Sequence, residues 1–293
     1  MARFTVLAAC LAATPALAEQ TIDLTFAAEL GGTPFSCAQT YSGLGSTGTP
    51  VQVLDYRMFV SNISLMSDDG TEVPLTLDED GRWQVDTVAL LDFEDATGSC
   101  TNGTAEMNAT VRGTAPQGTY TGVRFDVGVP FDWNHGDPTL APSPLNLTAM
   151  FWNWRGGYKF IKFETSPVTA DGMNIASSTH AEGAGGAEGA SGWFLHLGST
   201  LCGAASRTEA PAAPCANPNV MTVTLEGFDP AAQTIVIDPA PVLGTSDLTR
   251  NTPETSPGCM SFPNDPDCTT VLPKLGLPFN EAGAETQVLI SAR

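Results

Sequence analysis

The chain contains only three histidines, so each one can be weighed as a possible metal-binding group. His135 directly follows a strand-like segment, and His196 lies within or at the end of another. Imidazole is the commonest protein metal ligand, and two imidazoles with few neighbouring carboxylates suit Cu(I) or Zn better than Ca or Mg. The alternative is that each is a hydrogen-bonded, partly buried histidine. His180 lies in a Gly/Ala-rich stretch that predicts a solvated side chain.

A second group with possible chemistry is the aromatic run over residues 150–160, which holds five aromatic side chains. Trp152 and Trp154 are two positions apart, so a strand would place both indoles on one face. The run predicts either core packing or a paired indole surface that serves as a redox target or a stacking platform. Met150 and Met260 add thioethers, which are soft ligands for Cu(I) but also common packing groups.

Other catalytic machinery is missing from the sequence. There is no G-x-S-x-G, no P-loop, no H-E-x-x-H and no C-x-x-C-H haem motif. Acidic runs at residues 78–80 and 92–95 have the oxygen ligands that calcium uses, but turn solvation explains them equally well.

The composition narrows the classes of function. The chain of 293 residues has 12 basic and 32 acidic residues, so its net charge is −20. This negative charge disfavours nucleic acid and anionic lipid as partners. Hydrophobic residues make up 42%, enough for a sizeable core. No apolar run after the N-terminus approaches the ~20 residues that a membrane span needs.

Residues 1–18 have the pattern of a signal peptide, with Arg3, an apolar stretch and a small-residue cleavage site. This interpretation is favoured over lipidation at Cys10, and it predicts a periplasmic or secreted protein. Export leaves six cysteines, which predict disulfides. Of the 15 possible pairings, local spacing favours Cys202–Cys215 and Cys259–Cys268, which leaves Cys37–Cys100.

The elements that must position these residues are short strands. We predict an all-β fold, a single antiparallel β-sandwich-like domain over residues 19–293 with long loops and three disulfides. A helical turn is expected within residues 143–154, and long loops are expected at 177–192 and 204–218. The predicted strands cover residues 19–30, 55–66, 73–77, 82–91, 118–130, 158–164, 192–197, 220–225 and 234–237.

These motifs together resemble the MbnP-like copper proteins, also called metallo-mystery pair four-Cys proteins. The resemblance runs from about Phe26 to Leu277 and rests on ordered motifs at residues 35–37, 55–57, 91–95, 100–103, 128–135, 142–146, 150–160, 196–202, 258–260 and 265–268. The family name counts four cysteines, so one of the three expected pairs is additional in this chain.

The resemblance implies an exported protein of copper homeostasis that binds one Cu(I) ion. It also implies a partner, a di-haem enzyme of the MauG and cytochrome c peroxidase superfamily of the MbnH type, which oxidises the first tryptophan of W-x-W to kynurenine. Carried onto this sequence, Trp152 is the modified residue and Trp154 the second indole. His135 and His196 are the expected ligands, with Met260 as a third candidate, and Met150 is expected to support the site with Trp154.

We therefore expect a copper-binding protein that is not itself an enzyme, and in which His135 and His196 meet beside Trp152. Two alternatives remain open. One is a copper-dependent oxidoreductase, which would turn over a reductant or an oxidant. The other is a secreted β module that binds a ligand, such as a glycan, through Trp152 and Trp154, and would do so without metal.

Overall fold

A computed structural model describes residues 18–169 and 192–293 of the chain. The expected signal peptide, His180 and most of the expected loop at 177–192 lie outside these residues. The described chain is built almost entirely from strands, in agreement with the predicted all-β fold. None of its helices is long and apolar enough to cross a membrane.

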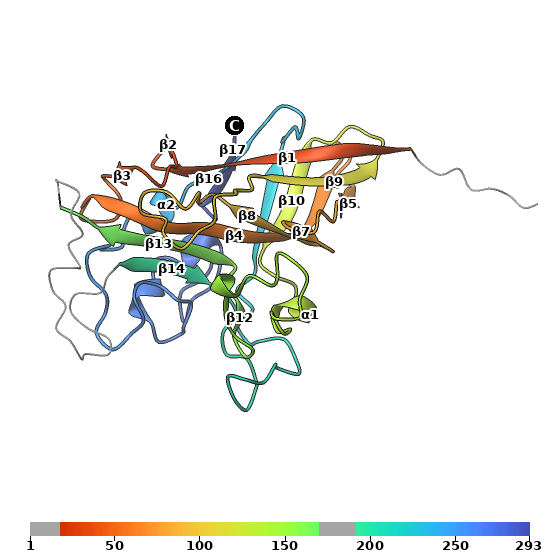
Figure 1. Ribbon diagram of the computed structural model, residues 1–293. Coiled ribbons are helices and arrows are strands. Elements are labelled where there is room, and N and C mark those ends of the chain that lie inside the picture. Colours follow the sequence, from red (N-terminus) through yellow and green to blue (C-terminus); the bar gives the residue numbers. More distant parts are fainter. Residues whose placement is uncertain (1–17, 170–191) are drawn as a thin grey trace, which may run out of the picture.

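Two larger sheets make up the body of the molecule, and in Figure 1 the sheet with β1 lies above the sheet with β4. The first sheet has the order β17–β16–β1–β9–β6, and β2 also pairs with β1. Its strands are β1 (Glu19–Leu30), β2 (Thr33–Pro34), β6 (Thr76–Leu77), β9 (Thr110–Pro116), β16 (Ile235–Ile237) and β17 (Ile290–Ala292).

The second sheet has the order β14–β13–β4–β10–β15 and is organised around the long strand β4. Four shorter strands, β3, β5, β7 and β8, extend it through β4. Its strands are β3 (Thr40–Tyr41), β4 (Val51–Met66), β5 (Glu72–Pro74), β7 (Gln84–Val85), β8 (Val88–Asp92), β10 (Gly122–Val127), β13 (Ile161–Pro167), β14 (Trp193–Leu197) and β15 (Met221–Glu226).

The two sheets pack face to face around a common hydrophobic core. In β1, Ile22, Leu24 and Phe26 are buried while their neighbours are exposed or half-buried, because successive side chains of a strand point to opposite faces. The ring of Phe26 packs edge-on against Phe125 of β10, with 5.9 Å between the centroids. Tyr56 of β4 is completely buried and donates its hydroxyl to the carbonyl of Ile237 in the opposite sheet.

One strand pairing departs from the antiparallel pattern. β1 and β16 pair in parallel, with Phe26 opposite Ile235, although about 200 residues separate them along the chain. Parallel neighbours need a long crossover connection, and here most of the protein forms that connection.

The site region is made of small elements at one end of the second sheet (Figure 1). They are the four-residue helix α1 (Phe131–Asn134), the 3₁₀ turn η1 (Thr148–Met150), and the hairpin formed by β11 (Phe151–Asn153) and β12 (Gly157–Tyr158). The expected helical turn is therefore η1. The remaining short helices are α2 (Ala240–Leu243), η3 (Pro266–Cys268) and η4 (Pro273–Leu275).

Three disulfides close the loops between these elements, as the fold prediction expects. They join Cys37 to Cys100, Cys202 to Cys215, and Cys259 to Cys268. The second and third are the pairs that local spacing favours, and the first is the pair that they leave. The second and third disulfides close loops with sequence separations of 13 and 9. The first of these two loops contacts His135, and the second contacts Trp152.

Candidate metal centre

His196 is held by a strand pair that buries its imidazole. It lies on β14 directly opposite Lys162 of β13, and its side chain is only 4% exposed. Its Nε2 lies 2.7 Å from Oε1 of Glu164, which is two residues further along β13 on the same face. The ring of Phe194 stacks on the imidazole from the same side of β14.

The carboxylate behind His196 belongs to a row of buried charges. Lys162 Nζ lies 3.4 Å from Glu164 Oε1 and also pairs with Asp55. Asp55 in turn pairs with Arg57, whose Nε lies 3.0 Å from Glu94 Oε1. Pairing offsets part of the cost of burying such charges, and burial raises the pKa of Glu94 at the end of the row to about 8. None of the residues in this row is among the candidates expected from the sequence, although the alternation in β13 places Lys162 and Glu164 on one face.

This row keeps Glu164 ionised. Burial tends to raise the pKa of Glu164, but the hydrogen bond with His196 and the positive charge of Lys162 outweigh burial, so the pKa lies below its usual value. Burial lowers the pKa of His196, and this outweighs the opposing hydrogen bond with Glu164. A neutral imidazole that faces a carboxylate through Nε2 carries its proton there, which leaves the lone pair on Nδ1.

The Nδ1 atom of His196 is buried and has no hydrogen-bond partner within the described part of the chain. Buried polar atoms are nearly always satisfied, so an unsatisfied one calls for an explanation. The nearest aromatic neighbour outside β14 is Trp152, whose ring centroid lies 6.5 Å from that of the imidazole. This places His196 beside Trp152, as expected from the sequence.

Trp152 is half-buried and is the middle residue of β11 in the β11–β12 hairpin. Phe262 stacks on its indole, with 6.0 Å between the ring centroids. Gly198 lies against the indole at Cζ3 and Cη2. A Cβ atom on Gly198 would lie 2.5 Å from Trp152 Cζ3, so only glycine allows this close approach. A cavity of about 320 Å³ opens beside the indole and is also lined by Arg155, Leu201 and Arg207.

His135 follows helix α1 and is also buried, at 5% exposure. Its Nδ1 lies 3.1 Å from the carbonyl oxygen of Trp154. The side-chain oxygen of Asn134 accepts a hydrogen bond from the Tyr158 amide, so the Asn134 amino group faces His135 Nε2 at 3.2 Å. His135 therefore carries its proton on Nδ1 and has its lone pair on Nε2. Burial lowers the pKa of His135, which favours the neutral form.

The two histidines contact the same hairpin at different points. His196 faces the ring of Trp152, whereas His135 bonds to the backbone of Trp154, and no direct contact between the two imidazoles occurs in the described structure. A hydrogen bond from Asn134 to Ser199, which follows His196 by three residues, connects their surroundings. The predicted meeting of both imidazoles at Trp152 stays a prediction.

Met260 lies in the chain segment that runs alongside His196. The neighbouring residues on both sides bond to the His196 backbone: the carbonyl of Cys259 accepts from its amide, and the hydroxyl of Ser261 donates to its carbonyl. Met150 is completely buried in the core, and its carbonyl accepts from the amide of Lys159.

The paired indole surface, one of the two interpretations of the aromatic run, does not form as a strand face. β11 ends at Asn153, so the alternation stops before Trp154, which lies in the turn and is 38% exposed. The acidic runs do not form a clustered cation site either, among the residues that the structure describes. Asp80 accepts hydrogen bonds from backbone amides of its own turn, and Asp92 and Glu94 are buried beside Arg57.

One other histidine cluster occurs among the described residues. The ligand atoms of His135, Cys202 and Cys215 lie within 4.8 Å of one another. Both sulfurs belong to the same disulfide, so neither is a thiolate that could bind a metal. Cys215 Sγ instead packs 3.6 Å from His135 Nε2, which ties the loop at residues 202–215 to this histidine.

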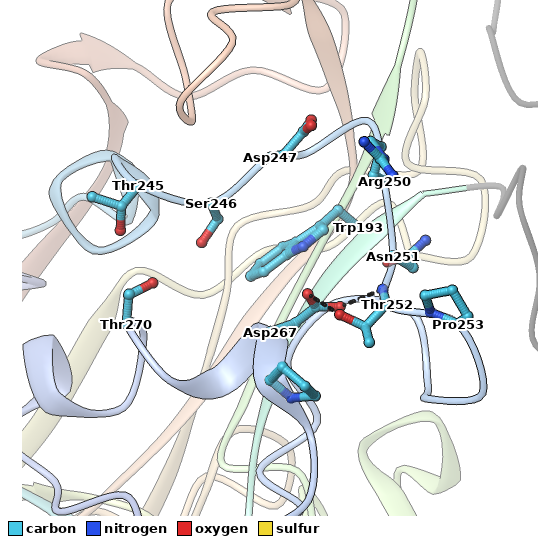
Figure 2. Close-up of a pocket in the computed structure, with 11 residues that line it drawn as sticks. Trp193, Thr245, Ser246, Asp247, Arg250, Asn251, Thr252, Pro253, Asp267 and Thr270 are labelled. Carbon is cyan, nitrogen blue, oxygen red and sulfur yellow. Dashed lines mark hydrogen bonds between the residues drawn. The ribbon is translucent and has the colours of Figure 1, made fainter. Parts of the chain in front are cut away.

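A separate polar cavity of about 410 Å³ lies on the opposite face of β14 (Figure 2). Trp193 forms one wall, and Asp267 on another wall accepts hydrogen bonds from the backbone and hydroxyl of Thr252. Trp193 and His196 are three positions apart on the strand, so their side chains point to opposite faces. This cavity is therefore separate from the histidine site.

The fold and the site define a disulfide-braced, β-sandwich-like protein with two buried neutral histidines beside a tryptophan hairpin. The MbnP family matches residues 19–261, and the chain belongs to this family. Among solved structures, MbnP from Methylosinus trichosporium is similar, with 28% sequence identity and a TM-score of 0.77 over 94% of this chain and 99% of that chain. Comparison with curated proteins finds no match.

Proposed function

We propose that this protein is an exported Cu(I)-binding protein of copper homeostasis, and that His196 and His135 are its imidazole ligands. The observation that carries the proposal is the buried Nδ1 of His196, which has a lone pair, no hydrogen-bond partner among the described residues and a position beside Trp152. Membership of the MbnP family supports the same function, because the family resemblance implies copper. The proposed role is binding of one ion, with copper as cargo and no turnover by the protein itself.

The donor set fits Cu(I). Metal ligation needs neutral imidazole, and burial lowers the pKa of both histidines. In each imidazole one nitrogen holds its proton toward a protein oxygen, Nε2 in His196 and Nδ1 in His135, and the lone pair is on the other nitrogen. Nδ1 of His196 has no partner among the described residues, whereas at Nε2 of His135 the ion would replace the hydrogen bond from the Asn134 amino group. Met260 would supply a soft thioether from the segment beside His196.

We further propose that the site matures by oxidation of Trp152 to kynurenine by a partner di-haem enzyme. With hydrogen peroxide as oxidant, two peroxide molecules would add two oxygens across the indole C2–C3 bond, cleave it and leave two waters. Hydrolysis would then release C2 as formate. The product has a ketone and an aromatic amine where the indole offered only an N–H donor. These polar atoms would lie beside His196, where they would order the groups around the ion.

The test compares copper binding before and after treatment with the di-haem enzyme and peroxide. Peptide mass spectrometry should locate a loss of one carbon and a gain of one oxygen at Trp152, and Cu(I) competition should show tighter binding by the treated protein. Trp152→Phe should fold but gain no copper affinity. Trp83→Phe is the matched control, because Trp83 packs under Arg82 and does not line the cavity beside Trp152.

Two results would contradict the proposal. One is a Trp152→Phe protein that binds Cu(I) as tightly as the treated wild type. The other is a His196→Ala protein, shown to be folded by circular dichroism, that retains wild-type affinity. Turnover of a reductant by the copper-loaded protein would favour the oxidoreductase instead.

A further inference from the structure

Three chain segments form the rim of the cavity beside Trp152, and each is held rigidly. The hairpin contributes Trp152 and Arg155. The loop closed by the Cys202–Cys215 disulfide contributes Arg207, and its backbone carbonyl there accepts from the Arg155 amide at 3.3 Å. The loop closed by the Cys259–Cys268 disulfide contributes Phe262, which stacks on Trp152. A surface fixed in this way loses little conformational entropy on binding.

The rim is unusually apolar for an exposed surface. Phe262 is 48% exposed and Leu201 60% exposed, and both line the cavity. Trp154, which precedes Arg155 in the hairpin turn, is 38% exposed. These are three of the six large hydrophobic side chains that are exposed in the described structure. Contiguous exposed apolar groups with a polar edge are typical of protein interaction sites.

The charge of the rim is opposite to that of the whole chain. Neither Arg155 nor Arg207 has an ion-pair partner among the described residues, although the chain has 32 acidic residues and a net charge of −20. Five other arginines do pair with carboxylates, so acidic partners are within reach elsewhere on the molecule. Screening limits such charges to a range of about 8–10 Å, so the two arginines act locally at the mouth of the cavity.

From these observations we infer that the rim of the Trp152 cavity is a docking surface for the oxidising partner. The surface consists of Arg155, Leu201, Arg207 and Phe262, which line the cavity, together with Trp154 beside Arg155 in the hairpin turn. The partner that fits it has an apolar contact centre edged by carboxylates, which pair with the two arginines. The inference rests on the proposed function, because the partner must approach Trp152 to oxidise it. Repulsion by the rest of the acidic chain would disfavour other orientations of such a partner.

The test measures association and modification separately. Biolayer interferometry would follow binding of the complete di-haem enzyme, without peroxide, to the wild type, Arg155→Glu and Arg207→Glu at low and high salt. We expect each reversal to weaken binding about tenfold and to reduce its salt dependence. Arg250→Glu is the control, because Arg250 is also without an ion pair among the described residues but lines the separate cavity in Figure 2. Its binding should stay within about twofold of wild type.

Kinetics of Trp152 oxidation provide the second readout. The two reversals should lower kcat/KM and leave the rate at saturating protein nearly unchanged, since neither arginine takes part in the oxidation. One outcome separates the two proposals. If the wild type binds the enzyme and the reversals weaken this binding, but Trp152 is not oxidised, the docking surface is supported and the proposed function is contradicted. Equal or tighter binding by both reversals, or absence of wild-type binding, would overturn the docking surface. Citrate binding to the wild type and the two reversals, measured in parallel, tests a small anion as the occupant. If the reversals abolish citrate binding and leave partner binding unchanged, the arginines serve a small anion and the docking surface is overturned.

Discussion

The Nε2 atom of His196 lies 2.7 Å from Oε1 of Glu164, and this contact determines which imidazole nitrogen is free. A proton held on Nε2 leaves the lone pair on Nδ1, the buried atom without a partner among the described residues. Carboxylates that hold a ligating histidine in this way commonly orient the ring and raise its basicity. Glu164 is therefore a positioning residue for His196.

Replacement of Glu164 should weaken copper binding without unfolding the protein. Glu164→Gln keeps the size of the side chain but removes its charge, so we expect Cu(I) affinity to fall by about 10–100-fold. Imidazole nitrogen NMR should also show a shift of the His196 tautomer population. Glu106→Gln is the matched control, because Glu106 is exposed and pairs only with Arg82 at the surface. Wild-type affinity together with an unchanged tautomer would contradict the role of Glu164.

Gly198 should be essential for the position of Trp152. An added methyl group would lie 2.5 Å from Trp152 Cζ3 and 2.8 Å from the carbonyl oxygen of Tyr158. Gly198→Ala should therefore destabilise the protein by about 1–3 kcal/mol and displace the indole. Urea unfolding would measure the first effect, and the rate of Trp152 oxidation by the partner enzyme would measure the second.

Gly203→Ala provides the control for this experiment. Gly203 is five residues further along the chain, has a negative φ, and has open space where an alanine methyl group would lie, with no atom within 4 Å. Its substitution should change stability by less than about 0.5 kcal/mol. If Gly198→Ala behaved like Gly203→Ala in both measurements, the close packing on Trp152 would have no functional role.

Much of the fold follows from local sequence patterns. β1 is predictable because Ile22, Leu24 and Phe26 alternate with polar residues and cover one face of a sheet. β9 is not among the predicted strands, because it contains Gly113 and ends in Pro116, which are both poor strand formers. Its place in the sheet depends on its neighbours instead. The backbone of Thr76 approaches so closely that any side chain at position 113 would collide with it.

The site is predictable only in part. The types and motifs of His196 and Trp152 mark them as candidates, and the structure places them side by side. The role of Glu164 depends on the register between β13 and β14, which local alternation does not define. The surroundings of His135 depend on the orientation of the Asn134 amide, which is set by the backbone of a hairpin 24 residues away. Such contacts arise only from the tertiary fold.

The Cys202–Cys215 disulfide should support both stability and copper binding, because its loop packs against His135 through Cys215. In a chain-entropy estimate, opening a loop of this length costs about 3 kcal/mol. We expect the double replacement Cys202→Ala and Cys215→Ala to lower the unfolding free energy by roughly this amount and to weaken Cu(I) retention. Replacing Cys37 and Cys100 in the same way is the comparison. It should affect stability but leave the copper affinity of the folded protein unchanged.

Asp92 should make the protein less stable as the pH rises from about 4 to about 7. Burial raises the pKa of Asp92 to about 6, and the nearby charge of Arg57 only partly opposes this. Asp92 therefore binds its proton more tightly in the folded protein than in the unfolded chain. The resulting stabilisation is complete at pH values below the ordinary aspartate pKa, and it is lost as the pH rises through the pKa of Asp92 in the folded protein. The pKa shift of Asp92 corresponds to about 3 kcal/mol of stability.

Asp92→Asn should remove this part of the pH dependence in urea unfolding from pH 4 to pH 8, whereas the exposed Asp68→Asn should keep the wild-type profile. A wild-type profile in Asp92→Asn would show that Asp92 is already ionised in the folded protein at acid pH.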